Sequence, residues 1–188
     1  MPRHRIDRVA LLRHLRDQFR LDWDGWHGIA HWARVRANGL LLAQQTGANT
    51  HVIELFAFFH DAARKDEGED QRHGGRGARL AQDLQGRFFD ASPDEMRLLG
   101  RACREHSDGL LECHDLRQWP RDHATVLSCW DADRLDLGRV GVKPLARYLC
   151  TAAARQPSFI EAAHERAVRD ALRLSRQRPS RREAVFGP

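Results

Sequence analysis

The feature that most constrains the fold is a histidine followed by an aspartate, His60 and Asp61, at the end of an apolar segment. Residues 51–61 read HVIELFAFFHD. Val52, Phe56 and His60 are four positions apart, so on a helix they form one buried stripe. Burying an imidazole and a carboxylate costs free energy unless they are paired or coordinate a metal. Alone, the pair is explained by an ion-paired core histidine, and only its context favours a metal.

Three other segments place one such residue on an apolar helical face. They contribute His31, His106 and Asp133, which lie three or four positions from Val35, Cys103 and Cys129, respectively. One buried polar residue on a helix is ordinary. Four chemically matched groups on separate helices indicate a common point, and a metal ion is the simplest object that satisfies all of them. The sequence thus predicts an all-α protein with a metal site between its helices.

Helical periodicity extends along almost the whole chain, and no segment alternates for long enough to predict a strand. Ser92, Pro93 and Glu95 have the pattern of a capped helix start. Glycines and charged segments separate the predicted helices. We expect helices over residues 7–19, 27–46, 50–63, 73–85, 93–106, 121–137, 144–154 and 158–176.

Length and composition predict one helical domain at residues 25–176, with an N-terminal helical extension at 1–24 and a disordered basic tail at 177–188. No stretch of eighteen apolar residues or secretory h-region occurs, so we expect a cytoplasmic protein without a membrane partner. The four cysteines include no Cys-x-x-Cys pair, and we expect them to be reduced thiols.

The order His … His-Asp … Asp resembles the HD superfamily of metal-dependent phosphohydrolases. The resemblance covers residues 25–140 and rests on five sequence blocks. They read HGIAHWARV, LFAFFHDAARKDEG, HGGRGARLA, REHSDG and WDADRLDLG. It implies an HD-type helical bundle whose metal ligands are His31, His60, Asp61 and Asp133. Such ligands suit Mn, Fe, Co, Ni or Zn better than Mg or Ca, with Mg left open.

Two of these assignments involve a choice between neighbours. His27 and His31 are four apart, and the family's His-x-x-Arg-Val pattern favours His31. Asp131 and Asp133 point about 200° apart on a helix, and the string Ala-Asp-Arg-Leu fits the family's late motif at Asp133. Asp136 and Asp131 are then expected to lie behind the ligands or in solvent.

His73 and His106 resemble the histidines that hold a second metal in binuclear members, with Asp61 as the bridge. They could instead contact substrate or act as a general acid. The doubled histidine usual in those members is absent, since Glu105 precedes His106. All but two of the 31 basic residues are arginine, which suits phosphate. The candidate phosphate-binding residues are those beside the metal motifs: Arg34, Arg64, Lys65 and Arg134.

The resemblance implies cleavage of a phosphate ester, of a nucleotide above all, by a metal-activated water. The alternative is a non-hydrolytic HD domain that binds nucleotides or regulates. The expected partner is a small phosphorylated substrate, and a homodimer is left open. Nucleic acid is disfavoured, because the arginines alternate with acids instead of forming a stripe with aromatic residues.

Overall fold

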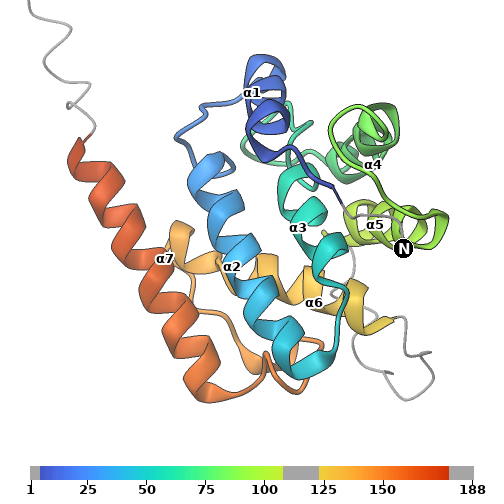
Figure 1. The fold of residues 1–188 in the computed structure, drawn as a ribbon. Helices are drawn as coiled ribbons and strands as arrows, with labels where there is room; N and C mark the ends of the chain where they lie inside the picture. The colour runs from blue at the N-terminus through green and yellow to red at the C-terminus, as the bar shows by residue number, and fades with distance from the viewer. Residues whose placement is uncertain (1–4, 108–122, 178–188) are drawn as a thin grey trace, which may run out of the picture.

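The structure is a computed structural model that describes residues 5–107 and 123–177. Over these residues the chain is an all-α bundle with isolated β-bridges but no strand (Figure 1). The fold class predicted from the sequence is therefore confirmed. In chain order the helices are α1 (Arg8–Gln18), α2 (Ile29–Thr46), α3 (Thr50–Phe59), α4 (His73–Leu84), α5 (Pro93–Glu105), α6 (His123–Arg134), the 3-10 turns η2 (Leu137–Val140) and η3 (Ala146–Tyr148), and α7 (Pro157–Gln177).

Helix α3 is the centre of the bundle. Every residue from His51 to Phe59 is buried, which matches its almost uninterrupted apolar sequence. It packs against α2 on one side and α5 on the other, and α6 crosses below both α2 and α3 (Figure 1). Helix α1 belongs to the same core, because Leu11 and Leu15 are buried in it. The end of α3, where the His-Asp pair stands, is thereby enclosed by other helices.

Short-range caps set where the central helices begin. The Asn49 side chain accepts hydrogen bonds from the backbone N–H groups of His51 and Val52 at the start of α3. At the start of α5, Ser92 and Glu95 form the predicted reciprocal capping box, with Pro93 at the first helical position. These contacts depend only on nearby residues, so the sequence predicts them well.

Helix α3 ends earlier than predicted, at Phe59 instead of residue 63. The N–H groups of Ala62 and Arg64 bond three residues back, to Phe59 and Asp61, which tightens the backbone into turns. Helix α4 lies against this end of α3, and a Cβ atom on Gly77 would come 2.1 Å from the Phe59 carbonyl oxygen. The tight turn and the close helix fix the backbone of the His-Asp pair.

The predicted helix over residues 144–154 is wrong. Only Ala146–Tyr148 is helical there, as a 3-10 turn. The Asp131 carboxylate accepts the N–H groups of Cys150 and Thr151 at 2.6 and 2.7 Å, and the Thr151 hydroxyl accepts the N–H of Ala154 at 3.1 Å. Side chains thus take the backbone donors that an α-helix would use.

Helix α6 and the cysteines also depart from expectation. Helix α6 ends at Arg134, because Asp136 N–H bonds to Asp133 three residues back.

Cys103 and Cys129 are free and buried, as predicted. Cys150 is disulfide-bonded, so the prediction of a reduced thiol is wrong there.

Two sequence predictions fall outside the described residues. They are the start of the helix predicted over residues 121–137, whose first two residues are not described, and the disordered tail, whose residues 178–188 are not described. Within the described part of the chain, none of the helices combines the length and the apolar character that a membrane span requires.

Candidate metal centre

Three of the predicted ligands converge from three helices. His31 comes from the first turn of α2, His60 from the end of α3 and Asp133 from the last turn of α6. The Nε2 atoms of His31 and His60 are 3.0 Å apart, and Oδ1 of Asp133 lies 3.3 Å from the first and 3.9 Å from the second. Both imidazoles are fully buried. The donor atoms of these side chains could hold a metal ion together.

Asp61 stands between this group and a second one. Its Oδ2 lies 3.5 Å from Nε2 of His31 and 3.6 Å from Nε2 of His60. Its other oxygen, Oδ1, lies 3.2 Å from Nε2 of His73 and 3.8 Å from Nε2 of His106. These last two nitrogens are 2.9 Å apart. One carboxylate therefore faces two pairs of imidazoles, which is the arrangement expected of a bridging ligand.

The far nitrogen of each imidazole fixes which nitrogen faces the centre. Nδ1 of His60 lies 3.1 Å from the Phe56 carbonyl oxygen, and Nδ1 of His106 lies 2.7 Å from that of Cys103. His73 makes the same contact with a backbone carbonyl. A carbonyl can only accept, so Nδ1 must carry the proton and the neutral ring presents the Nε2 lone pair inward. This pairing of an outer hydrogen bond with an inner lone pair is typical of metal-ligating histidines.

His31 is oriented by a carboxylate instead of a carbonyl. Its Nδ1 lies 2.7 Å from Oδ2 of Asp136, which is almost fully buried. Asp136 in turn accepts two hydrogen bonds from Arg34, at 2.6 Å from Nε and 3.1 Å from Nη2. Asp170 on α7 takes a further bond from this guanidinium at 3.3 Å. A carboxylate behind the ring raises the basicity of the inner nitrogen.

The electrostatics of the group keep its carboxylates ionised. Burial alone would raise the pKa of Asp61 and Asp133, but the surrounding histidines outweigh burial and hold both pKa values well below the usual range. Burial lowers the pKa of His60 to about 3. Burial and Arg139 would also lower the pKa of His31, yet hydrogen bonds to three carboxylates raise it to about 9. At His31 the neighbouring carboxylates thus outweigh burial.

The donor set fits a divalent transition ion. Two ligands about 2.1 Å from the same ion lie roughly 3.0–3.4 Å apart at tetrahedral or octahedral angles. The nitrogen and oxygen atoms of His31, His60, Asp61 and Asp133 are separated by 3.0–3.9 Å where distances are given above. Imidazole with carboxylate favours Mn, Fe, Co, Ni or Zn.

The structure distinguishes the candidate ligands that are close neighbours in the sequence. His27 turns away to pair with Glu67, 2.5 Å from its Nδ1. Asp131 is fully buried, but it binds the backbone of residues 150–151 and not the centre. Asp136 lies behind His31, in accord with the prediction. Of the alternatives considered, His31 and Asp133 are the ones whose donor atoms meet.

The four basic candidates for phosphate binding lie in different places. Arg64 reaches the centre, with Nη1 3.4 Å from Oδ1 of Asp61 and 3.2 Å from Nε2 of His73. Lys65 is exposed on the outer surface. The two others have structural partners: Arg34 is held by the carboxylates described above, and Arg134 bonds to the Tyr148 carbonyl at 3.2 Å. The contacts of these two arginines favour positioning roles over phosphate contact.

Arg139 is a basic residue near the centre that the sequence analysis missed. Its Nε donates to the Trp26 carbonyl at 3.0 Å, while its buried Nη1 has no hydrogen-bond partner among the described residues. That nitrogen is 3.9 Å from Oδ2 of Asp136. Its charge opposes the rise in the pKa of His31 and contributes to the lowered pKa of Asp133. Arg139 follows Asp136 by about one helical turn, and this spacing could have indicated that it lies near the centre. It was missed because η2 is a 3-10 turn, which helical periodicity did not predict.

Comparisons with known proteins support the fold. No protein-family model matches the sequence, and no curated protein matches it either. The structure is similar to the crystal structure of a predicted HD superfamily hydrolase from an uncultured Thermotogales bacterium. The TM-score is 0.60 at 24% sequence identity, over 94% of this chain and 95% of that one. The resemblance to the HD superfamily is thus confirmed at the level of the fold.

Proposed function

We propose that this chain, which has the fold of an HD superfamily hydrolase, is a metal-dependent phosphohydrolase. The observation that carries the proposal is the convergence of the inward-facing donors of His31, His60, Asp61 and Asp133. Structural ion pairs would not require four imidazole rings with their outer nitrogens bonded and their Nε2 atoms directed at two carboxylates. A cation is the natural counter-charge for that arrangement.

His31, His60, Asp61 and Asp133 would hold a divalent ion, while Oδ1 of Asp61 faces His73 and His106. Such an ion supplies Lewis-acid chemistry, acidifying a water and polarising a phosphoryl oxygen. Asp136 keeps the His31 ring in its binding orientation through Nδ1. His73 and His106 sit on the other side of Asp61, where they either complete a second ion site or donate a proton to the leaving group.

The substrate is a phosphate ester, with nucleotides as the class to test first. Two arginines near the metal centre support a phosphate substrate. Arg64 reaches Asp61 from the turn after α3, and Arg139 holds a buried N–H group without a partner in the described structure. A buried donor without an acceptor costs free energy in the absence of ligand, and a phosphate oxygen would satisfy it.

The test combines metal content with phosphate release. Wild-type protein should contain or take up Mn, Fe, Co, Ni or Zn, and should release phosphate from a nucleotide in a panel of mono-, di- and triphosphates. Asp133→Ala should lose both properties. Asp131→Ala is the matched control: it removes a buried carboxylate of the same helix that makes no contact with the centre, and it should keep metal.

Two outcomes would contradict the proposal in different ways. Protein that takes up no metal would remove the ion site. Metal-loaded protein that binds nucleotides but releases no phosphate from any ester would favour the alternative, a non-hydrolytic nucleotide-binding domain.

A further inference from the structure

A basic pocket lies outside the metal centre, between α1, α4 and the turn after α3. Its volume is about 490 Å³, within the range of small-molecule sites. Five basic side chains and one carboxylate line it, and none of the histidines or aspartates of the centre does so. The basic residues are Arg20, Arg64, Lys65, Arg76 and Arg79, and the acid is Asp83.

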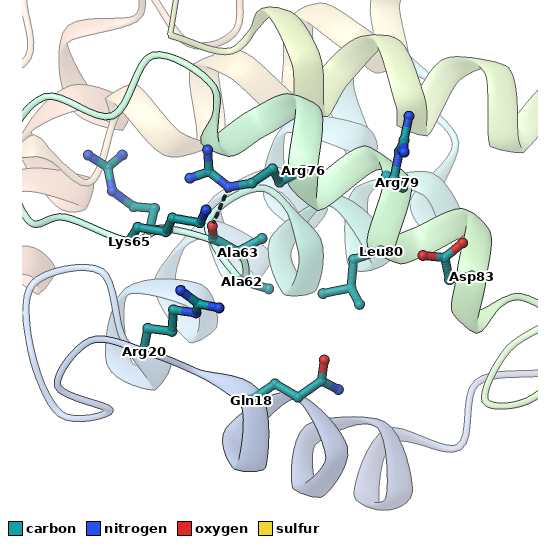
Figure 2. Close-up of a pocket in the computed structure, with 10 residues that line it drawn as sticks. Gln18, Arg20, Ala62, Ala63, Lys65, Arg76, Arg79, Leu80 and Asp83 are labelled. Atoms are coloured by element: carbon teal, nitrogen blue, oxygen red, sulfur yellow. Dashed lines mark hydrogen bonds between the residues drawn. The ribbon is translucent and has the colours of Figure 1, made fainter.

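Three of these side chains gather at one end of the pocket. Arg20, Lys65 and Arg76 direct their charged groups toward the same region, while Asp83 lies at the opposite end (Figure 2). They come from the α1–α2 connection, the turn after α3 and helix α4. Asp70 already pairs with Arg76, so the charges left for an anion at this end are those of Arg20 and Lys65, whose mutual repulsion a bound anion would offset.

The three charges differ in how they are held. Arg76 is fixed, because Nε donates to the Ala63 carbonyl at 2.9 Å and Nη2 pairs with Asp70. Arg20 and Lys65 are exposed, and within the described residues their side chains make no hydrogen bond or ion pair. Arg76 can therefore offer its remaining N–H groups, while Arg20 and Lys65 carry positive charges that no described residue balances. Such a site suits an anionic ligand, and arginine forks match phosphate oxygens.

The other residues that line the pocket indicate which chemical groups of a ligand it can accommodate. Ala62, Ala63 and Leu80 offer small apolar contacts, and no aromatic side chain lines the pocket. A nucleobase would therefore find no ring to stack on. Arg20, Lys65 and the fixed Arg76 line a pocket of about 490 Å³, which is larger than a single phosphate group fills, so the fitting class is an anion with two or more phosphate groups.

We propose that this pocket binds a polyphosphate moiety at a place separate from the metal centre. The turn that forms its wall follows His60 and Asp61 directly, and Arg64 contacts both sides: it lines the pocket and reaches Asp61. The proposal does not depend on the proposed hydrolase activity, because binding alone tests it.

The experiment is calorimetric titration of metal-free protein with pyrophosphate, at about 0.15 M salt so that long-range attraction is screened. Wild-type protein should bind one pyrophosphate per chain. Arg20→Ala should weaken binding about 10-fold, and the double variant Arg20→Ala/Lys65→Ala at least about 30-fold, because each loses a charge-assisted contact. Arg13→Ala, an exposed arginine of α1 that does not line the pocket, is the charge-matched control and should bind as wild type does.

A second arm separates this pocket from the metal centre as the source of binding. His31→Ala alters the centre and should leave pyrophosphate affinity unchanged. Loss of binding in His31→Ala would place the anion at the centre and overturn the proposal. No binding by wild type, undiminished binding by the double variant, or an equal loss in Arg13→Ala would each overturn it as well.

Discussion

Replacing Asp136 by asparagine should weaken metal binding without removing a metal ligand. The Asp136 carboxylate is 1% exposed and lies 2.7 Å from Nδ1 of His31, on the side of the ring away from the centre. Asparagine has nearly the same shape, so the ring keeps its place. The negative charge that polarises the imidazole is lost, and Arg34 keeps only Asp170 as an ionised partner.

The size of the effect follows from these contacts. Removing an outer partner of a ligating histidine typically costs 10- to 100-fold in metal affinity, or about 1.4–2.8 kcal/mol. The same substitution should lower the free energy of unfolding by about 1–3 kcal/mol, because a buried arginine loses a charged acceptor. The loss in affinity should be seen in protein that is still folded.

The measurement is competition for Zn²⁺ between metal-free protein and a chromophoric chelator, with thermal unfolding recorded in parallel. Asp131→Asn is the matched control, since Asp131 is also buried in this part of the chain but binds residues 150–151. It should destabilise the fold and leave the affinity for Zn²⁺ as it is. Equal affinities of wild type and folded Asp136→Asn would refute the reasoning, and so would an equal loss in Asp131→Asn.

Three further outcomes are expected. His106→Ala should lower turnover while the protein keeps one metal ion, because His106 faces the far oxygen of Asp61; elemental analysis showing complete metal loss would contradict this. Gly77→Ala should lower the free energy of unfolding by about 1–3 kcal/mol, since its Cβ would meet the Phe59 carbonyl. Gly75→Ala is its control in urea unfolding, because nothing lies within 4 Å there and alanine favours a helix. Glu54→Gln should cost about 1–2 kcal/mol at pH 7. Burial would raise the pKa of Glu54, but Arg8 and Arg36 hold it below its usual value. This stabilisation is present above the unfolded-state pKa and is lost as pH falls through the folded one, so the difference between wild type and variant should shrink in acid; a constant difference would contradict it.

The sequence by itself predicted the parts of the molecule that depend on local spacing. Periodic apolar residues gave the all-α fold, and capping residues such as Ser92 and Glu95 gave the start of α5. The pattern also predicted that His31, His60 and Asp133 would face inward, because helical period fixes which side of a helix is buried. In the structure the donor atoms of these three side chains, which come from separate helices, lie close together.

Tertiary structure decided the features that depend on a partner distant in the chain. Periodicity says that Asp131 and Asp136 lie on particular sides of their segment, but not that one binds the backbone near residue 150 and the other binds His31. The same limit explains the wrong helix at 144–154, where a side chain from α6 takes the backbone donors, and the unexpected position of Arg139. A local pattern determines which face is buried, whereas the group that meets that face is chosen by how the whole bundle packs.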